Sequence, residues 1–331
     1  MTSVTLKKLQ YETTLKEIEL IKEAFQIQLK ETLDLIRVSA PLFLRKSSGL
    51  NDDLNGVERK VSFTPKIFSQ SQPNALHAPP EMDSLEVVQS LAKWKRYALD
   101  KYGIKGLYAD MNAIRMDEDI DNIHSIYVDQ WDWEHVIMLS ERNHKTLESY
   151  ANAIFHCIKA VDVELSSANP TRDELLHDVK TLTFIDLDEL EDEHGIIDSE
   201  VERLCKEHKA IFLTGIGYPE RAPDYDDWSL NGDILVWNPV LEHSLELSSM
   251  GIRVNAQVLE EQMKEANCWE QRKDFPYHKL ILENKLPQTI GGGVGQSRLC
   301  MYLLQKKHIG EVQCSEWGNT EALTDDDVLM L

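Results

Sequence analysis

The chain of 331 residues is 42% hydrophobic and 28% charged, a composition typical of a globular protein with one large domain or two smaller ones. Its net charge of −22, from 35 basic and 57 acidic residues, leaves no basic block of the kind that binds nucleic acid, so we expect no nucleic-acid partner. No apolar run approaches the roughly 20 residues that cross a bilayer, the N-terminus is rich in Lys and Glu, and the five cysteines are scattered, so we expect a reduced cytoplasmic protein without membrane span, secretory signal or zinc site.

Residues 5–36 have the periodicity of a long amphipathic helix. Apolar side chains recur three and four residues apart, at Ile18, Ile21, Phe25, Leu29 and Leu33. Residues 35–44 follow as an apolar, β-prone stretch that contains Pro41. Because proline cannot donate to a ladder, we expect this strand at a sheet edge or at an interface.

Two polar stretches come next. Residues 46–60 predict a loop that places Asp52 or Asp53 over a pocket, and the alternative is an ordinary solvated turn. Residues 69–84, with three prolines, predict a connection without regular structure.

Residues 85–99 predict a strand that leads into a helix. Ser90 suits the N-cap of that helix, because its hydroxyl can accept a backbone N–H of the first turn. Lys93 and Lys95 point to different sides of the helix, so at most one of them should face a buried site.

Residues 106–134 predict two strands joined by an acidic loop. The first strand ends at Arg115, and the loop contains Glu118. Alternation along the second strand places four side chains on one face, namely Val128, Gln130, Asp132 and Glu134. Gln and Asp are poor core residues, but together on a strand face they suit the ammonium group of a zwitterion.

Residues 230–239 and 245–254 predict an antiparallel pair of strands. Asp233 and Glu246 lie near the ends that are remote from the connecting turn. Two carboxylates there suit Mg²⁺, which takes oxygen ligands from protein and from substrate phosphates. The alternative is that both are ordinary surface acids.

Residues 287–304 begin with a glycine-rich stretch, predicted as a loop, and continue as a helix. Glycine lets the backbone approach a ligand, and the N-terminus of a helix favours an anion. The stretch ends Gly-Gln-Ser-Arg and lacks a correctly spaced third glycine, which excludes a P-loop and a dinucleotide fingerprint. Arg298, in the first turns of the helix, can stack on a flat ring or bind phosphate oxygens; the alternative is a plain glycine turn with a solvated arginine.

The segment Gly293-Val-Gly-Gln-Ser-Arg298 resembles the third motif of class II aminoacyl-tRNA synthetases, and the strands around Arg115 and the helix with the Pro41 strand resemble the second and first. Longer similarity points to the ammonia-dependent asparagine synthetase (aspartate–ammonia ligase) family, in residues 90–96, 124–134, 221–228, 231–239, 246–254 and 287–298. The resemblance implies an α+β fold with a class II synthetase-like core, a mostly antiparallel sheet flanked by helices. It also implies a single catalytic domain over residues 1–331 and a homodimer whose interface includes the helix at about 5–36.

The implied reaction is ATP-dependent amidation of L-aspartate by ammonia to L-asparagine. The β-carboxylate attacks the α-phosphorus of ATP to give β-aspartyl-AMP and pyrophosphate, and ammonia then displaces AMP. The resemblance implies Mg²⁺ as cofactor, held by Asp233 and Glu246. It assigns catalytic roles to Arg115, Arg298 and Asp52, with Asp52 (or Asp53) as the group that takes a proton from ammonium.

The resemblance further implies two sets of substrate-binding residues. The aspartate set is Ser90, Lys95, Gln130, Asp132, Asp226, Ser248 and Arg253, in which Lys95 pairs with a carboxylate and Asp132 or Asp226 with the ammonium. The nucleotide set is Arg115, Glu118, Ile123, Val128, Glu246, Ser249, Gly293 and Arg298. The stretch between Gly217 and Arg221 is shorter than in the family, and residues 255–285 match no motif.

Three alternatives stay open. An enzyme that charges tRNA with aspartate would use the same motifs, but it would need a basic surface that this acidic chain lacks. A synthetase-like amino-acid sensor would bind without turnover, and loss of the site arginines or acids would indicate it. A glutaminase partner supplying ammonia is compatible with the sequence, although residue 2 is Thr and not a catalytic cysteine, so we expect free ammonia as the nitrogen donor.

Overall fold

The structure, a computed structural model, describes residues 3–52, 54, 58–66, 84–192, 195–196, 198–318 and 328–331. Asp53, part of the predicted 46–60 loop and almost all of the predicted 69–84 connection lie outside these residues. Within the described ranges, no helix is both long enough and apolar enough to cross a membrane.

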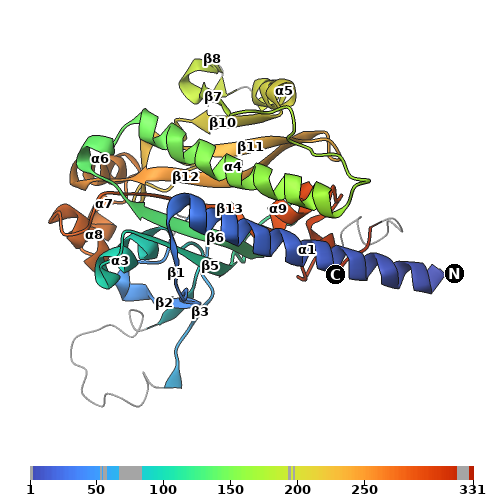
Figure 1. Cartoon of the computed structure of the whole chain (residues 1–331). Helices are drawn as coiled ribbons and strands as arrows, with labels where there is room; N and C mark the ends of the chain where they lie inside the picture. Colours follow the sequence, from blue (N-terminus) through green and yellow to red (C-terminus); the bar gives the residue numbers. More distant parts are fainter. Residues whose placement is uncertain are drawn as a thin grey trace.

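A sheet of eight strands forms the centre of the described chain (Figure 1). From edge to edge the strands are β1 (Ile36–Arg37), β5 (Gly106–Ile114), β6 (Tyr127–Val136), β13 (Thr289–Gly295), β12 (His243–Arg253), β11 (Asp226–Asn238), β10 (Ala210–Thr214) and β7 (Thr183–Asp186). Neighbouring strands are antiparallel, except that β1 with β5 and β10 with β7 are parallel. The predicted, mostly antiparallel sheet and its β11–β12 hairpin are confirmed.

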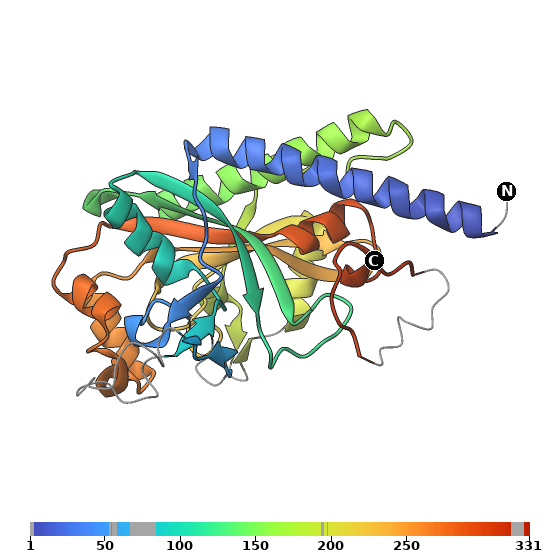
Figure 2. The ribbon, with the colours of Figure 1, turned by 90° about the horizontal axis from the view of Figure 1, so that it is seen from below.

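Two long helices, α1 (Ser3–Leu33) and α4 (His144–Ala168), cover one face of the sheet together with α9 (Gln296–Leu303), as Figure 2 shows. Alternation along β6 sends Trp131 and Trp133 into the core beneath these helices, where both are fully buried. The intervening Gln130, Asp132 and Glu134 therefore project from the opposite face, as the sequence predicts. The predicted N-terminal helix is also confirmed.

The opposite face of the sheet carries smaller elements (Figure 2). These are α3 (Ala92–Tyr102), the three-stranded sheet of β2 (Phe43–Arg45), β4 (Leu85–Val87) and β3 (Ser62–Phe63), the helices α6 (Ala256–Glu265), α7 (Trp269–Arg272) and α8 (Pro276–Leu282), and α5 (Asp198–His208) beside β10. A separate pair, β8 (Glu191–Asp192) and β9 (Gly195–Ile196), follows β7. Of these elements, α3 contributes side chains to the cavity described below.

Two local predictions were wrong. The stretch 35–44 is not one strand, because the chain leaves the sheet after β1, passes Pro41 in irregular backbone and joins the small sheet as β2. Ser90 is not the N-cap, because α3 begins one residue later with Leu91 in that position. The Ser90 hydroxyl nevertheless accepts the backbone N–H of Ala92 at 3.1 Å, so it does satisfy a free donor at the start of the helix.

Candidate active site

A cavity of about 640 Å³ lies on the face of the sheet opposite α1 and α4. Its walls come from segments far apart in the sequence, including α3, the β5–β6 connection, β11, β12, β13 and the start of α9. The cavity brings together nearly all of the predicted site residues: Asp52, Ser90, Lys95, Arg115, Glu118, Ile123, Val128, Gln130, Asp132, Asp226, Asp233, Glu246, Ser249, Arg253, Gly293 and Arg298. Ser248 is the exception, because its hydroxyl donates to the carbonyl oxygen of Gly293 within the sheet and the residue does not line the cavity.

The glycine-rich stretch is the floor of this cavity and is a strand, not the predicted loop. β13 pairs on both sides, with β6 and with β12. A Cβ atom at Gly291 would overlap the Glu134 carboxylate, and one at Gly293 would come within 2.6 Å of Oε1 of Gln130. The glycines therefore make room for polar side chains that lie flat across the sheet, which is a packing reason for glycine inside a strand.

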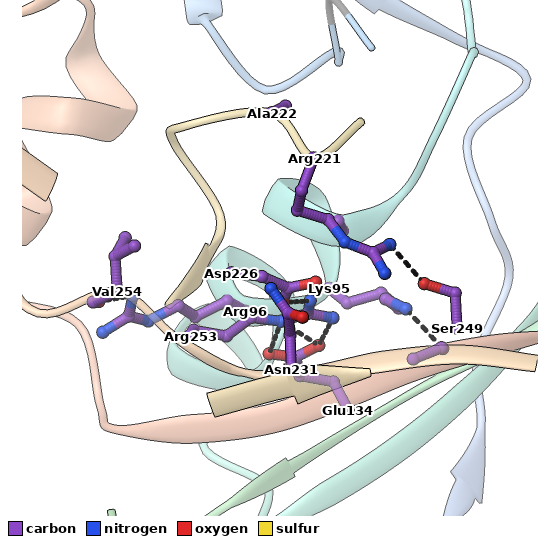
Figure 3. Close-up of polar contacts among 12 residues, drawn as sticks. Lys95, Arg96, Glu134, Arg221, Ala222, Asp226, Asn231, Ser249, Arg253 and Val254 are labelled. Atoms are coloured by element: carbon purple, nitrogen blue, oxygen red, sulfur yellow. Dashed lines mark hydrogen bonds and ion pairs between the residues drawn. The ribbon is translucent and has the colours of Figure 1, made fainter. Parts of the chain in front are cut away.

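A buried network of charges occupies one end of the cavity (Figure 3). The guanidinium of Arg253 donates to both carboxylate oxygens of Glu134, with Nη2 to Oε2 at 2.7 Å, and it also donates to Oδ1 of Asp226. These two carboxylates hold the pKa of Arg253 well above its ordinary value, although burial alone would lower it. The planar, bidentate pairing fixes the orientation of the guanidinium within the pocket.

Lys95 and Asp132 form a second buried ion pair in the same end of the cavity. The Lys95 ammonium donates to Oδ1 of Asp132 and, at 2.8 Å, to the carbonyl oxygen of Gly292. Burial lowers the pKa of Lys95, while Asp132 opposes the shift. Oδ2 of Asp132 is buried and has no hydrogen-bond partner among the described residues, so this oxygen is available to a ligand donor.

Arg115 and Arg298 both lie toward the other end of the cavity, which Arg221 also lines. Arg298 is in the first turn of α9, as predicted, and its contacts with the described residues are long, with Nη1 3.3 Å from the carbonyl oxygen and 3.5 Å from Oε2 of Glu246. Nε of Arg115 is buried without a hydrogen-bond partner among the described residues. Two weakly engaged guanidinium groups facing one cavity suit an anionic ligand.

The N–H of Ser297, in the first turn of α9, already binds an anionic side chain of the protein. The carboxylate of Asp129, which is buried, accepts the N–H of Ser297 at 3.1 Å. The same carboxylate lies 3.3 Å from Nζ of Lys22 on α1. A side chain of the protein therefore fills the anion position at this helix end.

The two predicted metal ligands lie on the cavity face of the β11–β12 hairpin. Their chain neighbours Ile234, Leu245 and Leu247 enter the core, so alternation turns Asp233 and Glu246 to the other face. Burial, reinforced by Glu246 and opposed by Arg221, raises the pKa of Asp233 to about 6. The described residues contain no cluster of three or more His, Cys, Asp or Glu ligands. Two carboxylates in one cavity do fit Mg²⁺, whose other ligands would come from phosphates and water.

Comparison with known proteins agrees with this arrangement. A family model described as aspartate–ammonia ligase matches residues 12–325. The chain is 50% identical over 319 residues to the aspartate–ammonia ligase of Clostridium perfringens (strain SM101), covering 92% of this chain and 90% of the relative. It is 50% identical over 314 residues to that of Lactobacillus johnsonii, covering 91% and 89%. The chain belongs to the aspartate–ammonia ligase family.

This ligase therefore makes asparagine from aspartate and ammonia in an ATP-dependent reaction. Its fold is that of class II aminoacyl-tRNA synthetases. The asparaginyl-tRNA synthetase of Pyrococcus horikoshii, solved with asparaginyl-adenylate, matches with a TM-score of 0.66 at 15% identity, over 91% of this chain and 67% of that chain. The predicted family, fold class and overall reaction are confirmed.

The ligase buries both Lys93 and Lys95 of α3, although the sequence predicts that at most one of them faces a buried site. Lys95 lies in the cavity, and Lys93 pairs with Asp224 at 2.6 Å on the other side of the helix. Nε2 of His278 on α8 lies 3.0 Å from the same Asp224 oxygen. The helices α6–α8 pack against this side of α3 and supply a second buried environment, which a local helix pattern does not reveal.

The region 255–285, which matched no motif, supports the loop that carries Asp226. The side-chain amide of Gln262 on α6 donates to the carbonyl oxygens of Pro223 and Asp226, at 3.1 and 2.9 Å. Its Oε1 accepts the N–H of Trp228 at 3.0 Å. One buried amide thus satisfies three backbone groups beside the site, so the region positions the pocket without entering it.

Sequence reasoning missed the role of three residues. Arg221 lines the cavity and binds Asp233, Glu134 is the bidentate partner of Arg253, and Gln262 braces the Asp226 loop. A lone basic residue in the acidic-aromatic stretch 221–228 was an available signal for Arg221. For Glu134, the strand alternation was a signal, because it placed a charged side chain on the same face as Asp132.

Proposed function

We propose that this ligase forms β-aspartyl-AMP and releases AMP and pyrophosphate. An oxygen of the β-carboxylate attacks the α-phosphorus, and the bond from phosphorus to the bridging oxygen of pyrophosphate breaks. The nitrogen lone pair of ammonia then attacks the acyl carbon, and AMP leaves as the C–O bond breaks. One observation supports this route. The same cavity has buried ion pairs that suit an amino acid at one end, Lys95–Asp132 and Arg253–Glu134, and it has Arg115 and Arg298 toward the other end.

The amino-acid end suits aspartate. We assign the ammonium to the buried Oδ2 of Asp132, with Gln130 and Asp226 nearby in the cavity wall. The carboxylates would meet Lys95 and Arg253, which are already held in place by fixed ion pairs. Ser90, at the start of α3, lines the same end. Preorganised charges of this kind bind without having to be reoriented by the substrate.

The nucleotide end suits ATP. Arg115 and Arg298 would stabilise charge on the α-phosphate as the bond to aspartate forms. Asp233 and Glu246 would hold Mg²⁺, which when bound neutralises phosphate charge. The remaining wall is assigned to the base and ribose: Glu118, Ile123, Val128, Ser249 and Gly293.

Asp52 is our candidate for the group that takes a proton from ammonium. It is buried, with 1% of its surface exposed, and it lines the cavity. The Lys93 ammonium lies 4.0 Å from its Oδ1, which favours the carboxylate form needed in a proton acceptor. Asp53, the alternative, lies outside the described residues.

Product analysis with ATP, Mg²⁺, aspartate and ammonium, without tRNA, tests this route. We expect asparagine, AMP and pyrophosphate in equal amounts, and less product when glutamine replaces ammonium. ADP and phosphate would indicate an acyl-phosphate route and contradict the proposal. Absence of nucleotide consumption would favour an amino-acid sensor.

We also propose a homodimer formed through α1 and the segment that follows it, in the cytoplasm. These segments expose large apolar side chains: Leu9, Leu15, Ile27, Ile36, Leu42 and Phe43 are each 45 to 56% exposed. Exposed apolar side chains of this size favour an interaction between chains. None of the five cysteines, all of which the structure describes, forms a disulfide, as is typical of proteins in a reducing compartment.

Light scattering at micromolar concentration tests the dimer. We expect about twice the chain mass of 38.0 kDa, and a shift toward monomer in Ile27→Glu, because the charge would be buried at the interface. Val163→Glu on α4, a site that is 44% exposed, is the matched control and should stay dimeric. A monomeric wild-type protein would refute the interface.

A further inference from the structure

Arg221 projects into the cavity from a segment whose base is fixed. The chain leaves β10, and the side chain of Asn231 on β11 holds the next turn by accepting the N–H of Ile216 at 3.1 Å and donating to its carbonyl oxygen at 2.8 Å. The backbone N–H of Arg221 then donates to the carbonyl oxygen of Gly217 at 2.8 Å. The backbone of this residue is therefore anchored, and only its long side chain is free to change partners.

The guanidinium of Arg221 points toward Ser249 on β12 (Figure 3). Nη2 donates to Oδ1 of Asp233 at 2.7 Å, and Nη1 donates to Oγ of Ser249, the residue opposite Asp233 in the β11–β12 register. Only 7% of Arg221 is exposed, yet its Nε has no hydrogen-bond partner among the described residues. A buried guanidinium with one donor unused is incompletely satisfied in this position.

Arg221 and Mg²⁺ would compete for the carboxylate of Asp233. Asp233 is one of the two acids that fit the metal, and its Oδ1 accepts the Arg221 guanidinium. A divalent cation at Asp233 would lie within a few ångströms of a fixed positive charge, and at that separation like charges repel strongly in a buried site. A triphosphate in the adjoining cavity offers the guanidinium planar, bidentate oxygen partners in exchange.

We propose that Arg221 is a substrate-binding residue with two successive partners: Asp233 in the empty enzyme, and the β- and γ-phosphates of ATP once the metal has taken Asp233. The side chain neutralises the metal carboxylates until the nucleotide arrives and then contacts the pyrophosphate that leaves in the first step. This assignment rests on the proposed nucleotide and metal sites, and it adds a third arginine to Arg115 and Arg298.

Calorimetric binding without turnover tests the exchange. Arg221→Gln removes the charge but keeps a polar side chain. In this variant we expect the Kd for Mn²⁺ alone to fall about tenfold, because no cation competes for Asp233, and the Kd for Mg·ATP without aspartate to rise about tenfold or more, because charged hydrogen bonds to phosphate are lost. Arg221→Lys keeps the charge and should leave the Mn²⁺ affinity within about threefold of wild type.

Arg203→Gln is the matched control, because Arg203 on α5 pairs with Glu200 and Glu207 on the surface, and neither Kd should change. Unchanged or weaker Mn²⁺ binding in Arg221→Gln, or unchanged Mg·ATP binding, would overturn the inference. Failure of the wild-type protein to bind Mg·ATP would instead contradict the proposed nucleotide site.

A second variant covers the case in which Arg221→Gln does not fold. Asp233→Asn releases Arg221 from its carboxylate, so inorganic pyrophosphate in the presence of EDTA should bind at least about threefold more tightly than to wild type. Equal or weaker pyrophosphate binding would count against the exchange.

Discussion

Gly291→Ala is expected to abolish aspartate activation and to destabilise the ligase. The new Cβ would overlap the Glu134 carboxylate and would lie 2.6 Å from Nη2 of Arg253. The strand cannot move aside freely, because β13 is paired on both edges. The Glu134–Arg253 pair must then open, and separating buried charges costs about 3 kcal/mol or more of folding free energy.

The measurement is aspartate-dependent ATP–pyrophosphate exchange together with denaturant unfolding. Gly103→Ala is the matched control: this exposed residue has φ of +64°, and nothing lies within 4 Å of the new Cβ. Its cost should be about 1 kcal/mol of backbone strain, with exchange activity retained. Activity of Gly291→Ala near the wild-type level would show that the pocket tolerates a side chain on its floor, contrary to the geometry.

Arg298→Ala is expected to reduce adenylate formation by at least about 100-fold while leaving the fold intact. A donor aimed at charge that develops in the transition state is worth about that factor or more when it is removed. The stability effect should be small, because the guanidinium makes only contacts of 3.3 to 3.5 Å in this structure.

The same exchange assay measures the effect, and thermal unfolding checks the fold. Arg203→Ala, which removes an exposed guanidinium that has two carboxylate partners on α5, should leave exchange unchanged. If Arg298→Ala kept near-normal exchange, the assignment of this arginine to the nucleotide would be wrong. If it lost stability and activity together, the side chain would be structural.

Local patterns in the sequence predicted several elements of the fold and most residues of the candidate site. The period of two along 127–134 correctly separated the core residues Trp131 and Trp133 from Gln130 and Asp132, because a strand exposes alternate side chains to opposite faces. The spacing of apolar residues likewise predicted α1. The resemblance in residues 90–96, 124–134 and 287–298 predicted the family and nearly all of the residues that line the cavity.

Only the tertiary structure shows which charged side chains pair and why β13 is rich in glycine. Arg253 meets Glu134 across 119 residues of chain, and Lys93 meets Asp224 across 131, so no local period contains either contact. The two hydrogen-bond partners of Arg221 are brought together by the β11–β12 register, which sets Asp233 opposite Ser249. The glycine-rich stretch that the sequence predicts as a loop is the strand β13. Glu134 and Gln130 occupy the space that side chains at these glycine positions would fill. Whether a charged side chain is buried depends on the residues around it in space, which local sequence patterns do not show.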